Sequence, residues 1–208
     1  MRIATVVKSL LAVTAVGMPL LVNAESNFQT GAAALTATAH VDFQITIPKF
    51  LFLRVGTGTG TAAGGFANNA TIDEITWAPT AAQVGTGALT GTGGDLTGGV
   101  ETAAVVANNG NVVLSSTTTS ALSDGGGDTI SYAQITTTAA HNTTGTTLAA
   151  PALADGATTN VTLTAVGKIV QQDAQWTYKY ANTLVPPAGT YGGVNVNGGR
   201  VTYTAALP

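Results

Sequence analysis

The chain has 208 residues, with seven lysines and arginines against ten aspartates and glutamates, and no cysteine. Such sparse, mildly acidic charge argues against nucleic acid or an anionic membrane surface as partner, because both require clustered cations. Without cysteine neither disulfides nor thiolate metal sites hold the fold, so burial and backbone pairing must do so. The 26 glycines, the many threonines and a charged fraction of only 8% predict an all-β protein.

The first 24 residues have the pattern of a secretory signal peptide. Arg2 and Lys8 form a positive leader, an apolar run extends from Leu10 to Val22, and Val22 with Ala24 gives the small-residue cleavage pattern. A membrane anchor is the alternative, but the run is shorter than the roughly 20 apolar residues that a spanning helix needs. We therefore expect cleavage after Ala24, passage through the periplasm, a secreted or cell-surface protein, and no membrane insertion of the mature chain.

Residues 31–47 alternate with a two-residue period. The odd positions are all glycine or apolar, and the even positions include threonine, histidine, aspartate and glutamine. This apolar edge is much longer than the usual strand of about five or six residues. It is either a long first strand that crosses between two sheets at Pro48, or an arm that pairs with another molecule. Only His40 and Asp42 would protect such an edge from association, which keeps the second interpretation open.

The next segment, KFLFLRVG at residues 49–56, is apolar on both faces and predicts a central strand. Residues 56–99 are rich in glycine and threonine and predict loops, with one strand over 71–77. Hairpins are expected over 101–116, around an Asn-Asn-Gly turn, and near the C-terminus around Asn197 to Gly199.

Further strands are expected over 128–137, 159–170 and 175–182, with Val161, Leu163 and Ala165 inward in the second of these. Roughly seven to nine strands at this spacing predict an immunoglobulin-like β-sandwich.

The two ends of the chain carry a family resemblance. The alternating arm TAHVDFQITIP leads into the apolar strand KFLFLRVG, and the chain closes with a Gly-Thr-Tyr turn and the alternating run VTYTA. This arrangement resembles subunits of chaperone-usher fimbriae, especially the archaic branch related to spore-coat-U domains. The resemblance implies an incomplete immunoglobulin-like sandwich, in which the N-terminal arm of a neighbouring subunit supplies the missing strand. It covers residues 31–55 and 175–208, and it lacks the cysteine pair of the commoner fimbrial pattern.

After the signal peptide predicted at residues 1–24, the resemblance implies a donor arm at 25–48 and a sandwich domain at 49–208. The side chains of the arm that would fill the groove are Leu35, Val41, Phe43, Ile45 and Ile47. The side chains beside the acceptor groove would be Val201, Tyr203 and Ala205. The implied partners are further copies of the chain, a periplasmic chaperone and an outer-membrane usher.

Catalytic and metal-binding patterns are weak. The histidines, His40 and His141, have no partner implied by spacing, and no nucleophile-elbow sequence accompanies them. Asp73 and Glu74 are adjacent, so on a strand they would face opposite ways and lie on an exposed edge. We expect no enzyme, no catalytic residues and no cofactor.

The DGGGD sequence, residues 124–128, brings two carboxylates near each other, as a calcium site would require. A single copy without further acidic residues favours a glycine turn between strands, so no metal site is expected. The glycine-rich stretches of residues 56–60 and 91–99 are interpreted as loops, because no helix follows to bind a phosphate.

Aromatic residues alternate at Trp176, Tyr178 and Tyr180. Buried, they would fill the core, and exposed, they would form a platform on which sugars stack. The sequence therefore predicts a structural subunit of an extracellular filament or fimbria, assembled by β-strand addition. The alternative is a monomeric cell-surface adhesion or carbohydrate-binding β-sandwich module.

Overall fold

The computed structural model describes residues 25–57, 66–143 and 145–208, and these fall into two units. Residues 25–47 form an arm, and Pro48–Pro208 form a β domain. The predicted signal peptide and part of the first glycine-rich stretch lie outside the described residues. Within the described ranges, no helix is long and apolar enough to cross a membrane.

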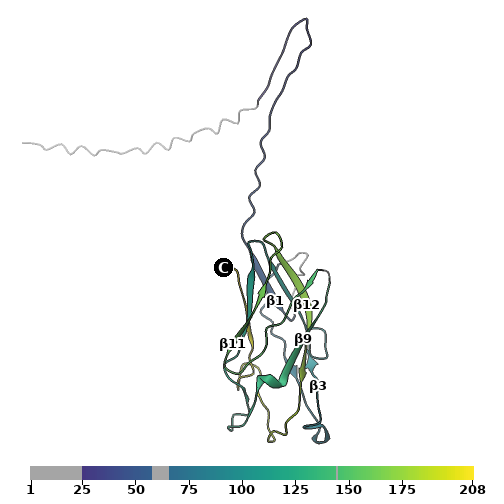
Figure 1. The fold of residues 1–208 in the computed structure, drawn as a ribbon, viewed down its shortest axis with the longest axis vertical. Helices are drawn as coiled ribbons and strands as arrows, with labels where there is room; N and C mark the ends of the chain where they lie inside the picture. The colour runs from purple at the N-terminus through teal and green to yellow at the C-terminus, as the bar shows by residue number, and fades with distance from the viewer. Residues whose placement is uncertain (1–24, 58–65, 144) are drawn as a thin grey trace, which may run out of the picture. The chain divides into compact units, whose positions relative to one another are not determined.

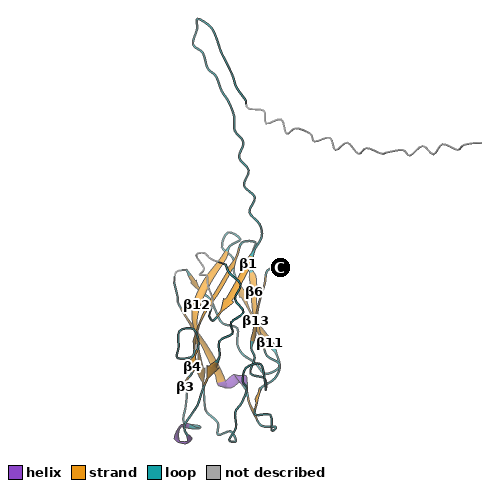
Figure 2. Ribbon diagram, turned by 180° about the vertical axis from the view of Figure 1, so that it is seen from behind, coloured by secondary structure: helices purple, strands orange, loops and turns teal. Residues whose placement is uncertain are grey.

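The domain is all-β, as predicted, and its longer strands form two sheets (Figures 1 and 2). The first sheet has the order β1 (Leu51–Val55), β5 (Val100–Ala107), β12 (Val170–Tyr180), β10 (Thr146–Thr147), with β3 (Leu89–Thr90) and β9 (Ile135–Ala140) also pairing with β12. The second has the order β11 (Thr158–Leu163), β6 (Val112–Thr117), β13 (Thr202–Ala206). In Figure 2, β6, β11 and β13 lie on one side of the domain and β12, β3 and β4 on the other.

Two short ribbons complete the strands of the described chain. They pair β2 (Ile75–Thr76) with β4 (Thr92–Gly93), and β7 (Leu122–Ser123) with β8 (Thr129–Ile130). Two single-turn 3-10 helices, Ala81–Gln83 and Tyr132–Gln134, lie in the connections. The predicted strand over 71–77 is thus reduced to two residues, and the one over 128–137 becomes a short strand, a 3-10 turn and the start of β9.

The core lies between the two sheets. Val105 of β5 and Trp176 of β12 are fully buried from the first sheet, and Leu114 of β6 from the second. The indole Nε1 of Trp176 donates to the carbonyl of Leu148 at 2.8 Å, which satisfies its polar group inside the core. The strand predicted over 159–170 ends at Leu163, the end of β11. Its predicted inward set is confirmed, because Val161, Leu163 and, just beyond the strand, Ala165 pack in or against this cluster.

The central strands of the first sheet are β5 and β12. β5 pairs with β1 on one side and β12 on the other, and it is buried on both faces. The prediction that KFLFLRVG is central was wrong, since β1 is an edge strand. Its second apolar face is covered by Phe66, whose ring lies 5.3 Å from that of Phe50 and 5.0 Å from that of Phe52. A local loop therefore gives β1 the two-faced apolar pattern of a central strand.

The predicted hairpin over residues 101–116 was also wrong. The Asn-Asn-Gly turn does connect two strands, but β5 belongs to the first sheet and β6 to the second. The turn residues bind other loops instead. The side chain of Asn108 donates to the carbonyl of Pro48 at 2.7 Å and accepts from the amide of Phe50 at 2.9 Å, while the amide of Gly110 donates to the carbonyl of Lys168 at 2.9 Å.

The C-terminal segment contains one strand of the described chain, not the predicted pair. Asn197 and Gly198 have φ of 51° and 73° and form a turn, and β13 follows it. β13 pairs antiparallel with β6, which already holds β11 on its other side. Because β6 serves as the partner, no strand is needed before the turn.

Candidate strand-pairing site

The arm, residues 25–47, is extended and has no strand, and every one of its residues is exposed. The side chains of Phe43 and Ile45 are 90% and 86% exposed, and the other predicted groove-filling residues are exposed too: Leu35, Val41 and Ile47. The interpretation of these residues as a first strand of the domain's own sandwich is therefore wrong. They form an unpaired alternating segment.

One contact folds the arm on itself. The Oε2 atom of Glu25 accepts from the amide of His40 at 2.9 Å and lies 2.7 Å from its Nδ1 atom. Both side chains are open to solvent, where such a pair contributes about 1 kcal/mol at most. This contact is too weak to prevent the arm from straightening and pairing elsewhere.

In the domain, the candidate site is the seam between β1 and β13, two neighbouring edge strands that do not pair. Within residues 25–57, 66–143 and 145–208, β1 pairs only with β5, and β13 pairs only with β6. The two strands approach within 8 Å between Cα atoms, yet no backbone hydrogen bond joins them. Among the described residues, each therefore has one edge with which no strand pairs, and these two edges face the same seam.

The inward side chains along the seam are half-buried. They include Leu53 and Val55 of β1 and Tyr203 and Ala205 of β13, all packed against the core cluster, and Val201 just before β13 is half-buried as well. On the opposite face of β13, Thr202 and Thr204 are exposed. The predicted alternation of VTYTA is confirmed, and its inward face is partly open at the seam.

Tyr203 fixes the position of β13 against the first sheet. Its hydroxyl lies 2.8 Å from that of Tyr178, and its ring centre lies 5.3 Å from that of Trp176. Burial raises the pKa of Tyr203 to about 12 and that of Tyr178 well above its usual value. Both phenols are therefore neutral at physiological pH, so the contact is an ordinary hydrogen bond between hydroxyls.

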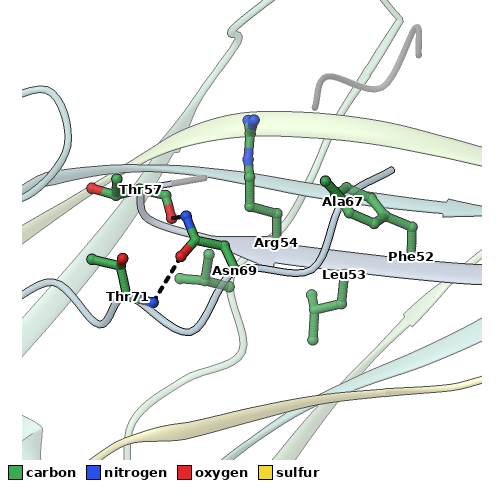
Figure 3. A pocket seen from close by; sticks show the side chains of 8 residues that line it. Phe52, Leu53, Arg54, Thr57, Ala67, Asn69 and Thr71 are labelled. Atoms are coloured by element: carbon green, nitrogen blue, oxygen red, sulfur yellow. Dashed lines mark hydrogen bonds between the residues drawn. The ribbon is translucent and has the colours of Figure 1, made fainter. Parts of the chain in front are cut away.

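A short loop runs beside β1. Residues 67–71 and β1 line a shallow pocket of about 100 Å³ (Figure 3). The side chain of Asn69 donates to the carbonyl of Thr57 at 3.3 Å and accepts from the amide of Thr71 at 2.8 Å. These bonds attach the loop at the end of β1 by side-chain contacts, without a strand ladder.

A group of carboxyls lies around Gly56, at the same end of β1. The carboxylate of Asp73 accepts from the amide and the hydroxyl of Thr57, and a carboxyl oxygen of Glu101 lies beside it. Both acids surround Gly56, which has φ of 82°, and a Cβ atom there would collide with both. The carboxylate of Asp95 accepts a hydrogen bond from the amide of Thr102, the β5 residue after Glu101, at 2.7 Å.

These acids have shifted pKa values. Burial raises the pKa of Glu101 to about 8, and the charges of Asp73 and Asp95 act in the same direction. Burial also acts to raise the pKa of Asp73, but hydrogen bonds from Thr57 and Glu101 hold it below its ordinary value. Glu101 is thus the protonated partner at neutral pH and Asp73 the ionised one. Of the two acids expected on an exposed edge, Glu74 is exposed and Asp73 is half-buried.

Other predicted candidates are placed as follows. The aromatic platform does not exist as a surface, because Trp176, Tyr178 and Tyr180 are all buried. The Nε2 atom of His141 lies 2.8 Å from the carbonyl of Thr143, within its own loop. No group of three or more metal-ligating side chains is assembled in the described ranges.

The DGGGD sequence forms a turn between β7 and β8, as expected. Oδ1 of Asp124 accepts three backbone amides, those of Gly126, Gly127 and Asp128, at 2.8 to 3.1 Å. Its carboxylate is therefore used to shape the turn.

Comparison with known proteins returned no match to any family model, curated protein or solved structure. The candidate site therefore stands on its own geometry.

Proposed function

We propose that the protein is the structural subunit of an extracellular filament assembled by β-strand addition, as in the fimbrial family that its ends resemble. The observation that supports this most is the combination of two facing, unpaired strand edges with an exposed, alternating arm on the same chain. The arm of one copy would occupy the seam of the next. Export through the periplasm, and assistance by a chaperone and an usher, belong to the same proposal.

The seam suits an extended segment. Leu51 pairs with Ala107 and Ala206 with Val113, so β1 starts and β13 ends at the same end of the domain. The two strands run in opposite directions, and a strand inserted between them is parallel to one and antiparallel to the other. Its alternate side chains would complete the half-buried inward face, and its backbone would satisfy both free ladders.

The energetics favour assembly only when side chains and backbone act together. Burying five large apolar arm residues contributes on the order of 10 kcal/mol. Association costs a similar amount, about 4 to 15 kcal/mol. Stable filaments therefore depend on backbone hydrogen bonds to both strand edges as well as on burial of the apolar side chains.

Insertion requires the seam to widen. Neighbouring strands lie about 4.8 Å apart, so a strand between two others needs roughly 9.6 Å. β1 and β13 approach within 8 Å between Cα atoms. An outward movement of β13 or β1 must therefore accompany docking, and strand addition should be slow.

The test uses the full mature chain with Phe43→Asp. A charge in the desolvated seam costs several kcal/mol, so this variant should remain monomeric by size exclusion and negative-stain microscopy. Gln44→Asp is the matched control, because position 44 lies on the polar edge of the arm, and it should assemble like the parent. Normal filaments from Phe43→Asp would contradict the proposal, as would a parent chain that stays monomeric at high concentration.

A further inference from the structure

We propose that the hairpin tip Val166–Ile169 of one copy docks into the pocket beside residues 184–187 of the next copy. This deepens the proposed function and rests on it, since it names the second contact that successive subunits make. The tip supplies two apolar side chains and Lys168. The pocket supplies an apolar wall and Asp128.

The two features lie at opposite ends of the domain. Strand pairing aligns Leu51 and Val170 with Ala107, which places residues 48–50, 108–111 and 164–169 at one end, the proximal end. β12 runs away from this end and finishes at Tyr180, and residues 181–187 follow it at the distal end. The C-terminus also lies at the proximal end (Figure 1).

No spacer separates the arm from the proximal end. Ile47 is the last predicted groove-filling residue, and Pro48 is already bound to Asn108 through its carbonyl at 2.7 Å. The amide of Phe50 also donates to Asn108, at 2.9 Å. When Ile47 occupies a neighbour's seam, that neighbour must therefore contact the proximal end of the donor.

The charges at the two ends of the domain decide which end of the neighbour the donor's proximal end contacts. An arm antiparallel to β1 would bring two proximal ends together, and each carries the exposed cations Lys49 and Lys168. An arm parallel to β1 brings the proximal end of one copy to the distal end of the next, where Asp128 is exposed. In the second arrangement the lysines of one copy face an aspartate of the next instead of other lysines, so the electrostatic interaction between the ends is attractive.

The hairpin tip is a tight turn closed by backbone hydrogen bonds. Val166 and Ile169 exchange backbone hydrogen bonds of 2.9 and 3.0 Å, and the two residues between them have φ of 58° and 69°. Lys168 thus holds a left-handed conformation that residues other than glycine rarely adopt. Val166 is 83% exposed and Ile169 52%, so two apolar side chains flank this lysine without cover in the described domain.

The pocket has the complementary character. It has a volume of about 290 Å³, and its lining includes Tyr180, Leu184, Val185, Pro187 and Asp128. Val185 is 78% exposed, although a buried asparagine, Asn182, fixes the chain just before it by bonds to residues 83–87. The pocket offers apolar side chains beside the carboxylate of Asp128, and the tip offers two apolar side chains beside the ammonium group of Lys168. The two surfaces are therefore complementary.

The test exploits the absence of cysteine. In filaments of the Lys168→Cys, Asp128→Cys variant, mild oxidation should give a ladder of disulfide-linked oligomers on non-reducing gels. Each single variant should give no ladder. The control is Asn160→Cys with Asp128→Cys, because Asn160 is exposed on β11, and it too should give none. All these positions are exposed, and circular dichroism checks that each variant is folded.

The outcomes separate the two proposals. Filaments that form without a ladder would overturn the docking of the tip and leave strand addition standing. Dimers linked through Lys168→Cys alone would show that proximal ends meet each other, which also overturns it. If the parent chain forms no filaments, the proposed function itself fails.

Discussion

The middle of the first sheet and the β1/β13 seam are built from the same alternating apolar pattern, yet they differ in burial. Inward residues of β5 and β12 are fully covered, whereas those of β1 and β13 are half open. The difference follows from pairing, because β5 and β12 have partners on both edges and the seam strands on one. The seam strands are half open because each pairs with a strand on one edge, and not because their composition differs.

The largest effect is expected when β13, one of the two seam strands, is removed. Truncation after Gly199 deletes β13, takes Tyr203 from the ring of Trp176 and exposes the core face of β6. The loss should be comparable with the whole stability of a domain, about 5 to 15 kcal/mol. We expect an unfolded chain with red-shifted tryptophan emission. An unchanged spectrum and melting temperature would show that β13 is a loose tail.

Leucine truncations compare the two regions directly. Leu114→Ala, in the closed core, should lower the free energy of unfolding by about 2 to 5 kcal/mol. Leu53→Ala, at the seam, should cost the monomer roughly half as much, because its side chain is only half-buried. In assembled filaments the cost of Leu53→Ala should rise towards that of Leu114→Ala. Urea denaturation of monomer and filament measures both, and equal costs in the monomer would contradict the comparison.

The acid pair gives the seam a pH dependence. Glu101 has a folded-state pKa of about 8 against an ordinary 4.5, so the folded state holds the proton that the unfolded state releases. The stability it gives is complete below pH 4.5 and is lost as the pH rises to about 8, with a slope of at most about 1.4 kcal/mol per pH unit. Asp73 acts oppositely, because its lowered pKa makes stability fall in acid.

Glu101→Gln should flatten the loss of stability between pH 5 and 8, because the amide carries no proton to release and still donates to Asp73. Glu74→Gln, at an exposed neighbouring position, is the control and should follow the parent curve. The measurement is the urea midpoint across this pH range. A parental slope in Glu101→Gln would mean that another group carries the effect.

Features set by the two-residue alternation of side chains could be predicted from the sequence. Features set by contacts between distant segments could not. The all-β class, the inward set of β11 and the alternation of β13 follow from side chains two residues apart. The pairing of β5 and β6 with other strands, and the cover that Phe66 gives to β1, depend on segments far apart along the chain. The carboxyl pair was missed for the same reason, since Asp73 and Glu101 are 28 positions apart in the sequence and meet only around Gly56. The lone charged residue of ETAAVVA, a strand that is otherwise apolar except for Thr102, was the one available indication.

The smallest expected effect concerns the hydroxyl pair that joins β13 to the first sheet. Tyr203→Phe keeps the ring on Trp176 and removes the hydrogen bond to Tyr178, which should cost about 0.5 to 1.5 kcal/mol. Because the Tyr178 hydroxyl is then left in the core without this partner, the cost should lie at the upper end of that range. Tyr178→Phe combined with Tyr203→Phe should recover part of the loss, since no unsatisfied hydroxyl remains. Thermal unfolding of the three variants measures this coupling; strictly additive losses would show that the two hydroxyls act independently and that packing alone holds β13 at the seam.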